Sequence, residues 1–338
     1  MNFSHGSPLR ATVLGLFNGN YAVDMFFVLS GFVLQNMLTG AGFIHQLAYW
    51  VRRLIRIYPL LWVSLLAGAI SVGMFDRIAW MHGSPALSTW VDDLLRLPRG
   101  PVGIIRDFIP VDYNLNPVVW TIRIEIEASL IYPFVFLLWN RYAGAGKLVL
   151  LAATILLSMA CREGVAHYLY MFVVGLGIKD LENSRTSRSG AIKLLGLALG
   201  LLLVAGFRER GHSFLPDLIC AASSALILYV VAFQCPPRLF SLLNRPALVH
   251  LGRLSYAYYL FNAVILWSLV HLAKAGNLEF LLSGSASDWV QLLRAGTFMI
   301  LAMILTLGLS EAMHRAVEYP SIALGRTLQQ ALLRRLKR

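Results

Sequence analysis

The sequence predicts an all-α, polytopic membrane protein, and three observations lead to this fold class. Of its 338 residues, 58% are hydrophobic and only 14% are charged, whereas a soluble domain carries about 25% charged residues. Apolar stretches of roughly the length that crosses a bilayer recur along the whole chain. Most of the polar segments between them are short, so the chain reads as one bundle of membrane helices.

Charge and cysteine content exclude several other classes of protein. The 29 Lys and Arg residues outnumber the 17 Asp and Glu residues, which gives a net charge of +12. A nucleic-acid-binding domain would carry such charge on a polar surface, so we expect no nucleic-acid partner. The three cysteines have neither CxxC nor Cys/His spacing, which predicts no disulfide framework and no metal site. The segment 1–10 lacks the pattern of a signal peptide.

Nine apolar stretches each predict a transmembrane helix. Their approximate limits are 22–39, 56–75, 119–139, 147–160, 165–180, 192–207, 214–234, 252–273 and 296–317. A bilayer core about 30 Å thick takes roughly 20 residues, so the shortest stretches could instead be re-entrant or core segments. Their repetition without polar domains between them favours full spans.

The distribution of Lys and Arg over alternate loops predicts the orientation. The richer set includes the segment 52–56 and the C-terminal tail, so the positive-inside rule places both in the cytoplasm. The first visible span then starts outside without a signal. A tenth helix before it, ending near residues 2–7, would remove this difficulty, and we therefore expect Met1 to lie inside a longer reading frame. The alternative is a nine-span protein with a translocated N-terminal tail.

Two segments are predicted to lie outside the bilayer core. The stretch 76–118 combines several Trp and Pro residues with mixed charges, which indicates a structured outer loop. The tail 321–338 intersperses apolar with basic residues, as in a helix on an anionic inner leaflet, although a solvated tail is the alternative. We therefore divide the chain into a transmembrane domain, 1–320, and a basic amphipathic cytoplasmic tail, 321–338.

Ionisable or small polar residues beside and within the apolar stretches mark candidate sites, because a charge in a membrane is costly and is usually functional or paired. Asp24 begins an apolar run that Ser30 and Gly31 interrupt. On a helix, Ser30 and Gly31 share a face with Phe27, so either another helix or a thin ligand could approach closely there.

A second candidate site is the basic segment 52–56. Arg52 and Arg56 are four residues apart, so both guanidinium groups project from one helix face and could hold phosphates together with Arg53. The alternative is that these arginines act only as topology anchors.

A third site lies in the segment 116–127, where three charges fall within five residues of a span. Arg123 and Glu127 lie on one face and are expected to form a structural pair. Glu125 lies on another face, which makes it the more plausible functional acid. A fourth candidate is His5, whose imidazole could act as a general base, although a histidine near a chain start is usually just exposed.

Three of these segments together resemble motifs of the membrane-bound acyltransferase family 3, bacterial proteins of about ten spans that O-acylate sugars. Residues 23–32 (VDMFFVLSGF) resemble its VDxFFxLSGF, residues 52–59 (RRLIRIYP) its RRxxRIxP, and residues 120–125 (WTIRIE), closing on Pro133, its W(S/T)LxxE…P. Weaker similarities are LGRLSY at 251–256 with Tyr259–Leu260, and VEYP at 317–320.

Two features depart from the family pattern. The family's first helix carries an arginine ten residues before an essential histidine; His5 matches this histidine, and the arginine would precede Met1. The family often has a histidine at the position of Asn262, so we assign no catalytic role there.

The resemblance implies that an acyl group, most often acetyl, moves from cytoplasmic acyl-CoA to a hydroxyl of a glycan or lipid-linked saccharide, directly or through an acyl-enzyme. Arg52, Arg53 and Arg56 would hold the CoA phosphates, and the pantetheine arm would pass beside Ser30 and Gly31 toward His5. His5 would be the general base, oriented by Asp24 or Glu125.

The expected location is the bacterial inner membrane, with multiple spans, a cytoplasmic C-terminus and membrane lipids as partners. We expect no permanently bound cofactor, since acyl-CoA is a substrate. A non-enzymatic transporter or flippase of a saccharide lipid is the main alternative, and a scaffold membrane protein ranks below both.

Overall fold

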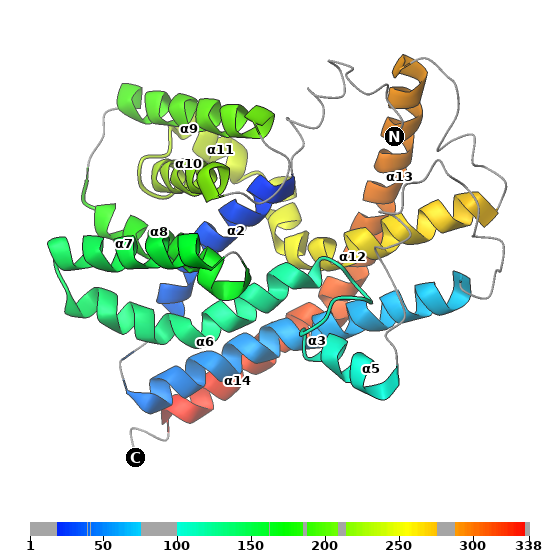
Figure 1. The fold of residues 1–338 in the computed structure, drawn as a ribbon, viewed down its shortest axis with the longest axis horizontal. Coiled ribbons are helices and arrows are strands. Elements are labelled where there is room, and N and C mark those ends of the chain that lie inside the picture. Colours follow the sequence, from blue (N-terminus) through cyan, green and yellow to red (C-terminus); the bar gives the residue numbers. More distant parts are fainter. Residues whose placement is uncertain are drawn as a thin grey trace. The chain divides into compact units, whose positions relative to one another are not determined.

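The structure is a computed structural model that describes residues 19–38, 40, 42–75, 100–161, 163–184, 188–208, 214–275 and 288–334. Every regular element in these ranges is helical (Figure 1). The predicted all-α class is therefore confirmed for the described part of the chain.

The helices follow the apolar stretches of the sequence. They are α2 (Gly19–Leu34), α3 (Phe43–Phe75), α5 (Gly100–Phe108), α6 (Val119–Arg141), α7 (Ala145–Ala160), α8 (Gly164–Ile178), α9 (Arg188–Arg208), α10 (Phe214–Phe233), α11 (Pro237–Leu243), α12 (Pro246–Ala275), α13 (Asp288–Met313) and α14 (Tyr319–Arg334). Turns of 3-10 helix, Gln35–Met37 and Lys179–Leu181, follow α2 and α8, and the π-helical turn His314–Glu318 joins α13 to α14. Each predicted span coincides with one of these helices.

Length and composition do not confirm nine full spans. Four described helical segments are long and apolar enough to cross a membrane: Phe43–Met74, Phe214–Phe233, Pro246–Ala273 and Leu293–Arg334. Three others, Tyr21–Met37, Ala145–Ala160 and Ser189–Ala205, are apolar but shorter. They fall below the roughly 20 residues that a bilayer core requires of a straight helix.

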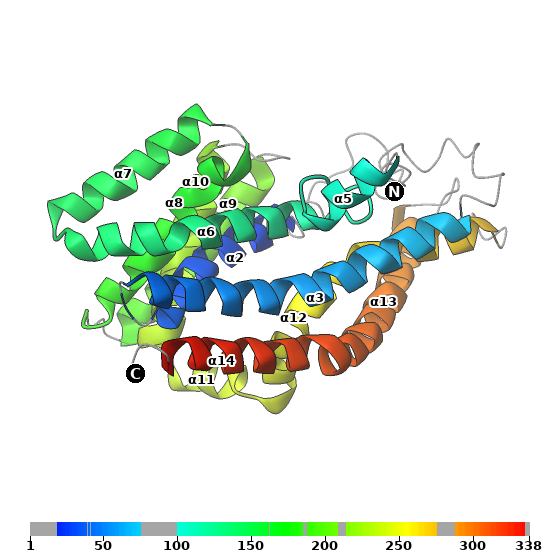
Figure 2. The ribbon, with the colours of Figure 1, turned by 90° about the horizontal axis from the view of Figure 1, so that it is seen from below.

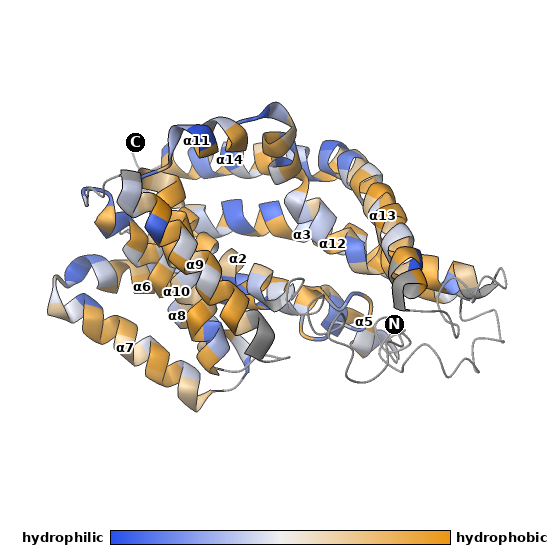
Figure 3. Cartoon of the chain, turned by 90° about the horizontal axis from the view of Figure 1, so that it is seen from above, coloured by the Kyte–Doolittle hydropathy of each residue, from blue (hydrophilic) through white to orange (hydrophobic). Residues whose placement is uncertain are grey.

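Large apolar side chains face outward along several helices, as expected of a surface in contact with lipid. On α7, Leu148 and Val149 are each 68% exposed, and on α13 Leu293 is 70% exposed. Figure 3 shows apolar residues along both helices, whereas α14 carries more polar ones. Soluble monomers rarely expose apolar surface of this extent, so the fold supports membrane insertion.

The helices fall into two compact units. Among the described residues, unit 1 is built from α3 after residue 50, α5, the first residues of α6, α12 from residue 250, α13 and most of α14. Unit 2 contains α2, the first residues of α3, the rest of α6, α7 to α11, and the first residues of α12. Each unit is described by itself below.

In unit 2, helix α2 packs against α8 at backbone contact distance (Figure 1). Gly31 on α2 faces the backbone of Phe172, and Gly175 on α8 faces the backbones of Val28 and Phe32. Small residues at such positions let membrane helices approach closely. The Tyr132 hydroxyl of α6 adds a hydrogen bond to the Gly31 carbonyl oxygen. The face predicted around Gly31 is thus occupied by another helix.

In unit 1, α3 lies beside both α12 and α14. The Tyr256 hydroxyl donates to the Ile57 carbonyl oxygen at 2.9 Å, and Ser268 donates to Ser71 at 3.1 Å, so α3 and α12 run in the same direction. Arg52 bonds to Gln329 of α14, and Figures 1 and 2 both show these helices side by side.

The glycine contact gives a test of the fold. In Gly175→Ala the added Cβ would lie 2.8 Å from the Phe32 nitrogen, and closer still to the Val28 carbonyl oxygen. Because these are backbone atoms, the helices must separate, and we expect a loss of about 1–3 kcal/mol, the usual range for overpacking. Gly200→Ala is the matched control, since a Cβ there meets nothing within 4 Å. Thermal unfolding in detergent should show a lower midpoint for the first variant only; equal midpoints would contradict the α2–α8 contact.

Candidate active site

The arginine segment of α3 gathers positive charge with a residue of α14. The Arg52 Nη1 atom donates to the Gln329 side-chain oxygen at 2.8 Å, and Arg56 and Arg326 both lie close enough to Arg52 to repel it. The third arginine, Arg53, is only 4% exposed. Like charges held together disfavour each other unless an anion joins them. Arg52, Arg56 and Arg326, called the arginine cluster below, are therefore suited to a phosphate group.

Close helix contact brings Arg326 to the cluster. A Cβ on Gly325 would lie 3.1 Å from the Arg52 carbonyl oxygen, and Ser321, Gly325 and Gln329 are the buried residues of α14. The sequence predicted a helix in this tail but gave no sign that Arg326 would meet α3. The boundary between the predicted domain and tail at residue 320 stays a prediction.

Asp24 lies in a buried polar group of unit 2. Its side chain is fully buried, and Asp217 and Cys220 of α10 are close to it. Asp217 is 1% exposed and contacts the Nε2 atom of His167, on α8, at 3.5 Å. Two acids in one apolar environment disfavour double ionisation. This group therefore has to hold a proton or a positive charge of its own.

The hydrogen bonds of His167 determine which ring nitrogen carries a hydrogen in its neutral form. Its Nδ1 atom is 3.1 Å from the carbonyl oxygens of both Ser158 and Cys161 at the end of α7. Carbonyl oxygens only accept hydrogen bonds, so Nδ1 carries a hydrogen. A neutral His167 would then point a lone pair from Nε2 at Asp217. One further proton on this pair, either as imidazolium with carboxylate or as imidazole with carboxylic acid, would remove the repulsion between that lone pair and the carboxylate.

Glu125, the other predicted acid, lies on α6 and is 5% exposed. Glu125 precedes Tyr132 by seven residues, which is about two helical turns. Asp24 precedes Gly31 by the same number of residues on α2. Tyr132 bonds to Gly31, and α2 and α6 run in the same direction in Figure 1. The two predicted acids therefore lie at the same level of unit 2.

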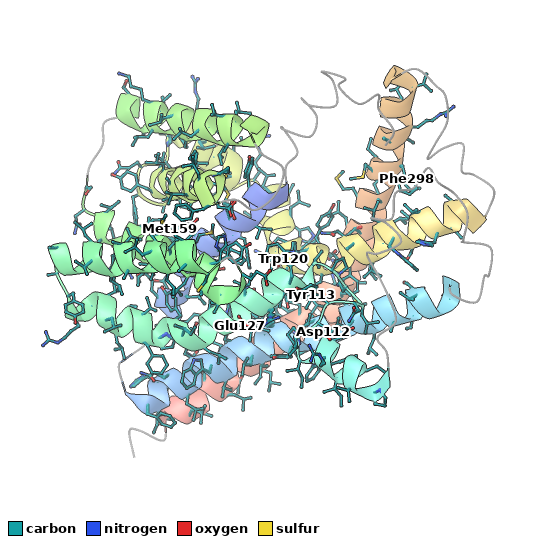
Figure 4. The ribbon with its side chains drawn as sticks, viewed as in Figure 1. Asp112, Tyr113, Trp120, Glu127, Met159 and Phe298 are labelled. Atoms are coloured by element: carbon teal, nitrogen blue, oxygen red, sulfur yellow. The ribbon has the colours of Figure 1, made fainter. Side chains whose placement is uncertain are left out.

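In unit 1, hydrogen bonds join the start of α6 and the residues just before it to α12. The Asn116 side-chain amide donates to the Leu260 carbonyl oxygen at 2.8 Å, and the Thr121 hydroxyl lies 2.7 Å from that of Tyr259. The segment 116–127 and the weaker similarity at Tyr259–Leu260 thus form one contact. Figure 4 shows Trp120 at the beginning of this helix and Glu127 two turns further along it.

Polar contacts also order the described part of the predicted outer loop. Asp107 accepts hydrogen bonds from the backbones of Asn114 and Leu115 and from the Asn114 side chain. Burial raises the pKa of Asp107, and these bonds oppose the shift. Nearby, the bond from Arg106 lowers the pKa of Asp112. A structured loop is therefore confirmed for residues 100–118, while 76–99 lie outside the described residues.

The remaining predicted residues have the following placements. His5 lies outside the described residues. Ser30 is 7% exposed on α2, and its predicted contact with the donor stays a prediction. Arg123 donates to the Val111 carbonyl oxygen at 3.1 Å, and its pairing with Glu127 also stays a prediction. Among the described residues, no group of three or more His, Cys, Asp or Glu side chains could hold a metal ion.

Comparison with known proteins decides the family. A family model described as an acyltransferase domain, that of acyltransferase family 3, matches residues 1–311. The chain belongs to this family. It is therefore an O-acyltransferase rather than a transporter or a scaffold.

One curated relative of this acyltransferase is Nodulation protein 10 from Rhizobium leguminosarum bv. viciae. It is 24% identical over 303 residues, which cover 82% of this chain and 80% of the relative. No solved structure matches the chain.

Sequence reasoning missed His167, Asp217 and Arg326. His167 and Asp217 are ionisable residues inside apolar stretches, a signal that could have marked them. The contacts of these three residues join different helices, so no pattern of neighbouring residues in the sequence predicts them.

The shared proton predicts an asymmetric response at Asp217. In Asp217→Asn the amide can donate to the Nε2 lone pair of a neutral His167, so we expect stability close to that of the wild type. Asp217→Leu leaves Nε2 without that partner, and we expect a loss of about 1–3 kcal/mol. Ser223→Ala, on the same helix and bonded to the Ile219 carbonyl oxygen, controls for change in α10. Thermal unfolding in detergent measures all three; equal losses in the Asn and Leu variants would contradict the shared proton.

Proposed function

We propose that this acyltransferase moves an acyl group, typically acetyl, from cytoplasmic acyl-CoA to a hydroxyl of a cell-surface glycan or lipid-linked saccharide at the bacterial inner membrane. The observation that supports this proposal most directly is the arginine cluster, which joins three cations from two helices. CoA is an anionic donor whose phosphates such a cluster recognises. The distribution of Lys and Arg predicts that this end of α3 is cytoplasmic, where acyl-CoA is made.

The reaction needs a base for the acceptor and a stable leaving group. His5 would take the proton of the acceptor hydroxyl as its oxygen attacks the thioester carbonyl carbon. A C–O bond forms, the C–S bond breaks, and the CoA sulfur leaves as a thiolate that takes up a proton. Asp24 or Glu125 would orient the imidazole and stabilise its charged form. Both acids are buried in unit 2, where a carboxylate interacts more strongly than in water.

The first test addresses the base. His5→Ala should abolish transfer from labelled acetyl-CoA, because no other group is assigned to take the hydroxyl proton. His45→Ala is the matched control, since His45 on α3 has no assigned role. Scintillation counting of labelled acceptor or released acetate measures both, and full activity in His5→Ala would refute this role.

The second test addresses the arginine cluster. Replacing Arg52 and Arg56 with Gln removes two charges that would contact the donor, so the apparent KM for acetyl-CoA should rise by about tenfold or more, with a smaller change in kcat. Arg141→Gln, at the end of α6, is the control for loss of a cationic residue. Steady-state kinetics with each substrate varied in turn separates donor from acceptor effects. A change confined to the acceptor KM would contradict the assignment.

Mass spectrometry identifies the acceptor. Surface glycans from a deletion strain should lack an acyl group that the parent strain carries. Complementation with the wild-type gene should restore it, and complementation with the His5→Ala gene should not. Identical glycans in deletion and parent strains would contradict a surface-glycan acceptor.

A further inference from the structure

A polar pocket of about 360 Å³ lies in unit 1, where α12 meets the π-helical turn between α13 and α14. Its lining residues are His250, Arg253, Glu311, His314, Arg315 and Tyr319. None of them belongs to the arginine cluster. Its volume is within the range of small-molecule sites, and π-helical turns are frequent at functional sites.

The pocket acid Glu311, and Glu318 in the adjoining π-helical turn, have partners within the protein. The Glu311 carboxylate contacts His250 Nε2 at 2.8 Å through one oxygen and Arg315 Nη2 through the other. His314 Nδ1 contacts Glu318 at 2.8 Å, and Glu318 is 2% exposed. These contacts offset the negative charge, so the carboxylates do not prevent an anion from entering.

Two groups at the pocket are available to a ligand. Arg253 is exposed and has no ion-pair partner among the described residues. It precedes Tyr256 by one turn of α12, and Tyr256 bonds to the Ile57 carbonyl oxygen beside Arg56. Tyr319 is 66% exposed, so the face of its ring can stack on a planar base. An arginine beside an exposed aromatic ring suits a nucleotide that carries a phosphate group.

The pocket and the arginine cluster are a short distance apart along one helix. Tyr319 of the pocket and Arg326 of the cluster are seven residues apart on α14, which is about 10 Å at the rise of an α-helix. They also lie on nearly the same face, since seven residues make almost two full turns. One ligand with two separate phosphate groups could therefore reach both sites.

We propose that this pocket binds the 3′-phosphorylated adenosine of the acyl-CoA donor, while the arginine cluster binds the diphosphate. The inference rests on the proposed function, because it assumes acyl-CoA as the donor. CoA carries a diphosphate and a separate 3′-phosphate, with one ribose between them. Arg253 contacts the 3′-phosphate, Tyr319 stacks on the adenine, and the paired histidines and Glu311 form the polar wall.

The test compares CoA with dephospho-CoA, which lacks only the 3′-phosphate. Both dissociation constants are measured by titration calorimetry with the purified protein in nanodiscs of neutral phosphatidylcholine. Wild type should bind CoA about tenfold more tightly than dephospho-CoA. Arg253→Gln should bring this ratio close to one by weakening CoA alone. Tyr319→Leu should weaken both ligands by a similar factor, since both carry adenine. Arg245→Gln, directly before α12 and outside the pocket, should behave as wild type.

Each other outcome has a defined meaning. An unchanged ratio in Arg253→Gln, with acetyl transfer intact in the wild type, would overturn the pocket assignment and leave the proposed function standing. A wild type that neither binds CoA nor transfers acetyl would overturn both. Competition by phosphatidylglycerol without any preference for CoA would assign the pocket to a lipid head group. If Arg253→Gln fails to fold, Arg253→Lys supplies the same ratio, which should fall between those of the wild type and one; a wild-type ratio would overturn the assignment.

Discussion

Several polar groups placed among apolar helices find partners on neighbouring helices, and these contacts organise both units of the structure. Leaving a buried polar group without a hydrogen bond costs about 1–3 kcal/mol in proteins, and lipid supplies no replacement. His167 therefore bonds to the end of α7 and lies 3.5 Å from Asp217, and Asn116 bonds to the backbone of α12. Because each partner lies on another helix, the same contacts that satisfy polar groups also position the residues that carry the chemistry.

The position of α2 depends on glycine as well as on polar contacts. Gly31 and Gly175 let α2 and α8 touch through their backbones, and the same face of α2 then presents Asp24 to α10. A larger residue at either glycine would move Asp24 relative to Asp217 and Cys220. Helix packing thus explains Gly31 within the first motif, whereas the role of Ser30 stays a prediction. This packing also fixes the position of α2 and therefore of Asp24, two turns before Gly31.

The sequence predicted the helices better than the site. Hydropathy located a helix at every predicted span, because apolar stretches are a local property, and the helical period placed Arg52 and Arg56 together. The span count was less predictable, since several helices are shorter than a bilayer core. The roles proposed for Arg326 and Arg253 depend on their contacts with α3 and on the π-helical turn, and the hydrogen on His167 Nδ1 depends on two carbonyl oxygens at the end of α7. No local pattern encodes these long-range contacts.

The π-helical turn explains how α13 and α14 serve two neighbours. A π-helical turn contains more residues than an α-helical turn, so it rotates the helix that follows relative to the one before. The end of α13 and the turn can therefore direct Glu311, His314 and Arg315 toward α12, while α14 directs Gly325 and Gln329 toward α3. In a continuous α-helix, the faces that contact α12 and α3 would be related by the regular helical period alone. The turn thus lets one helical segment line the polar pocket and complete the arginine cluster, which is the arrangement that a donor with two separate phosphate groups requires.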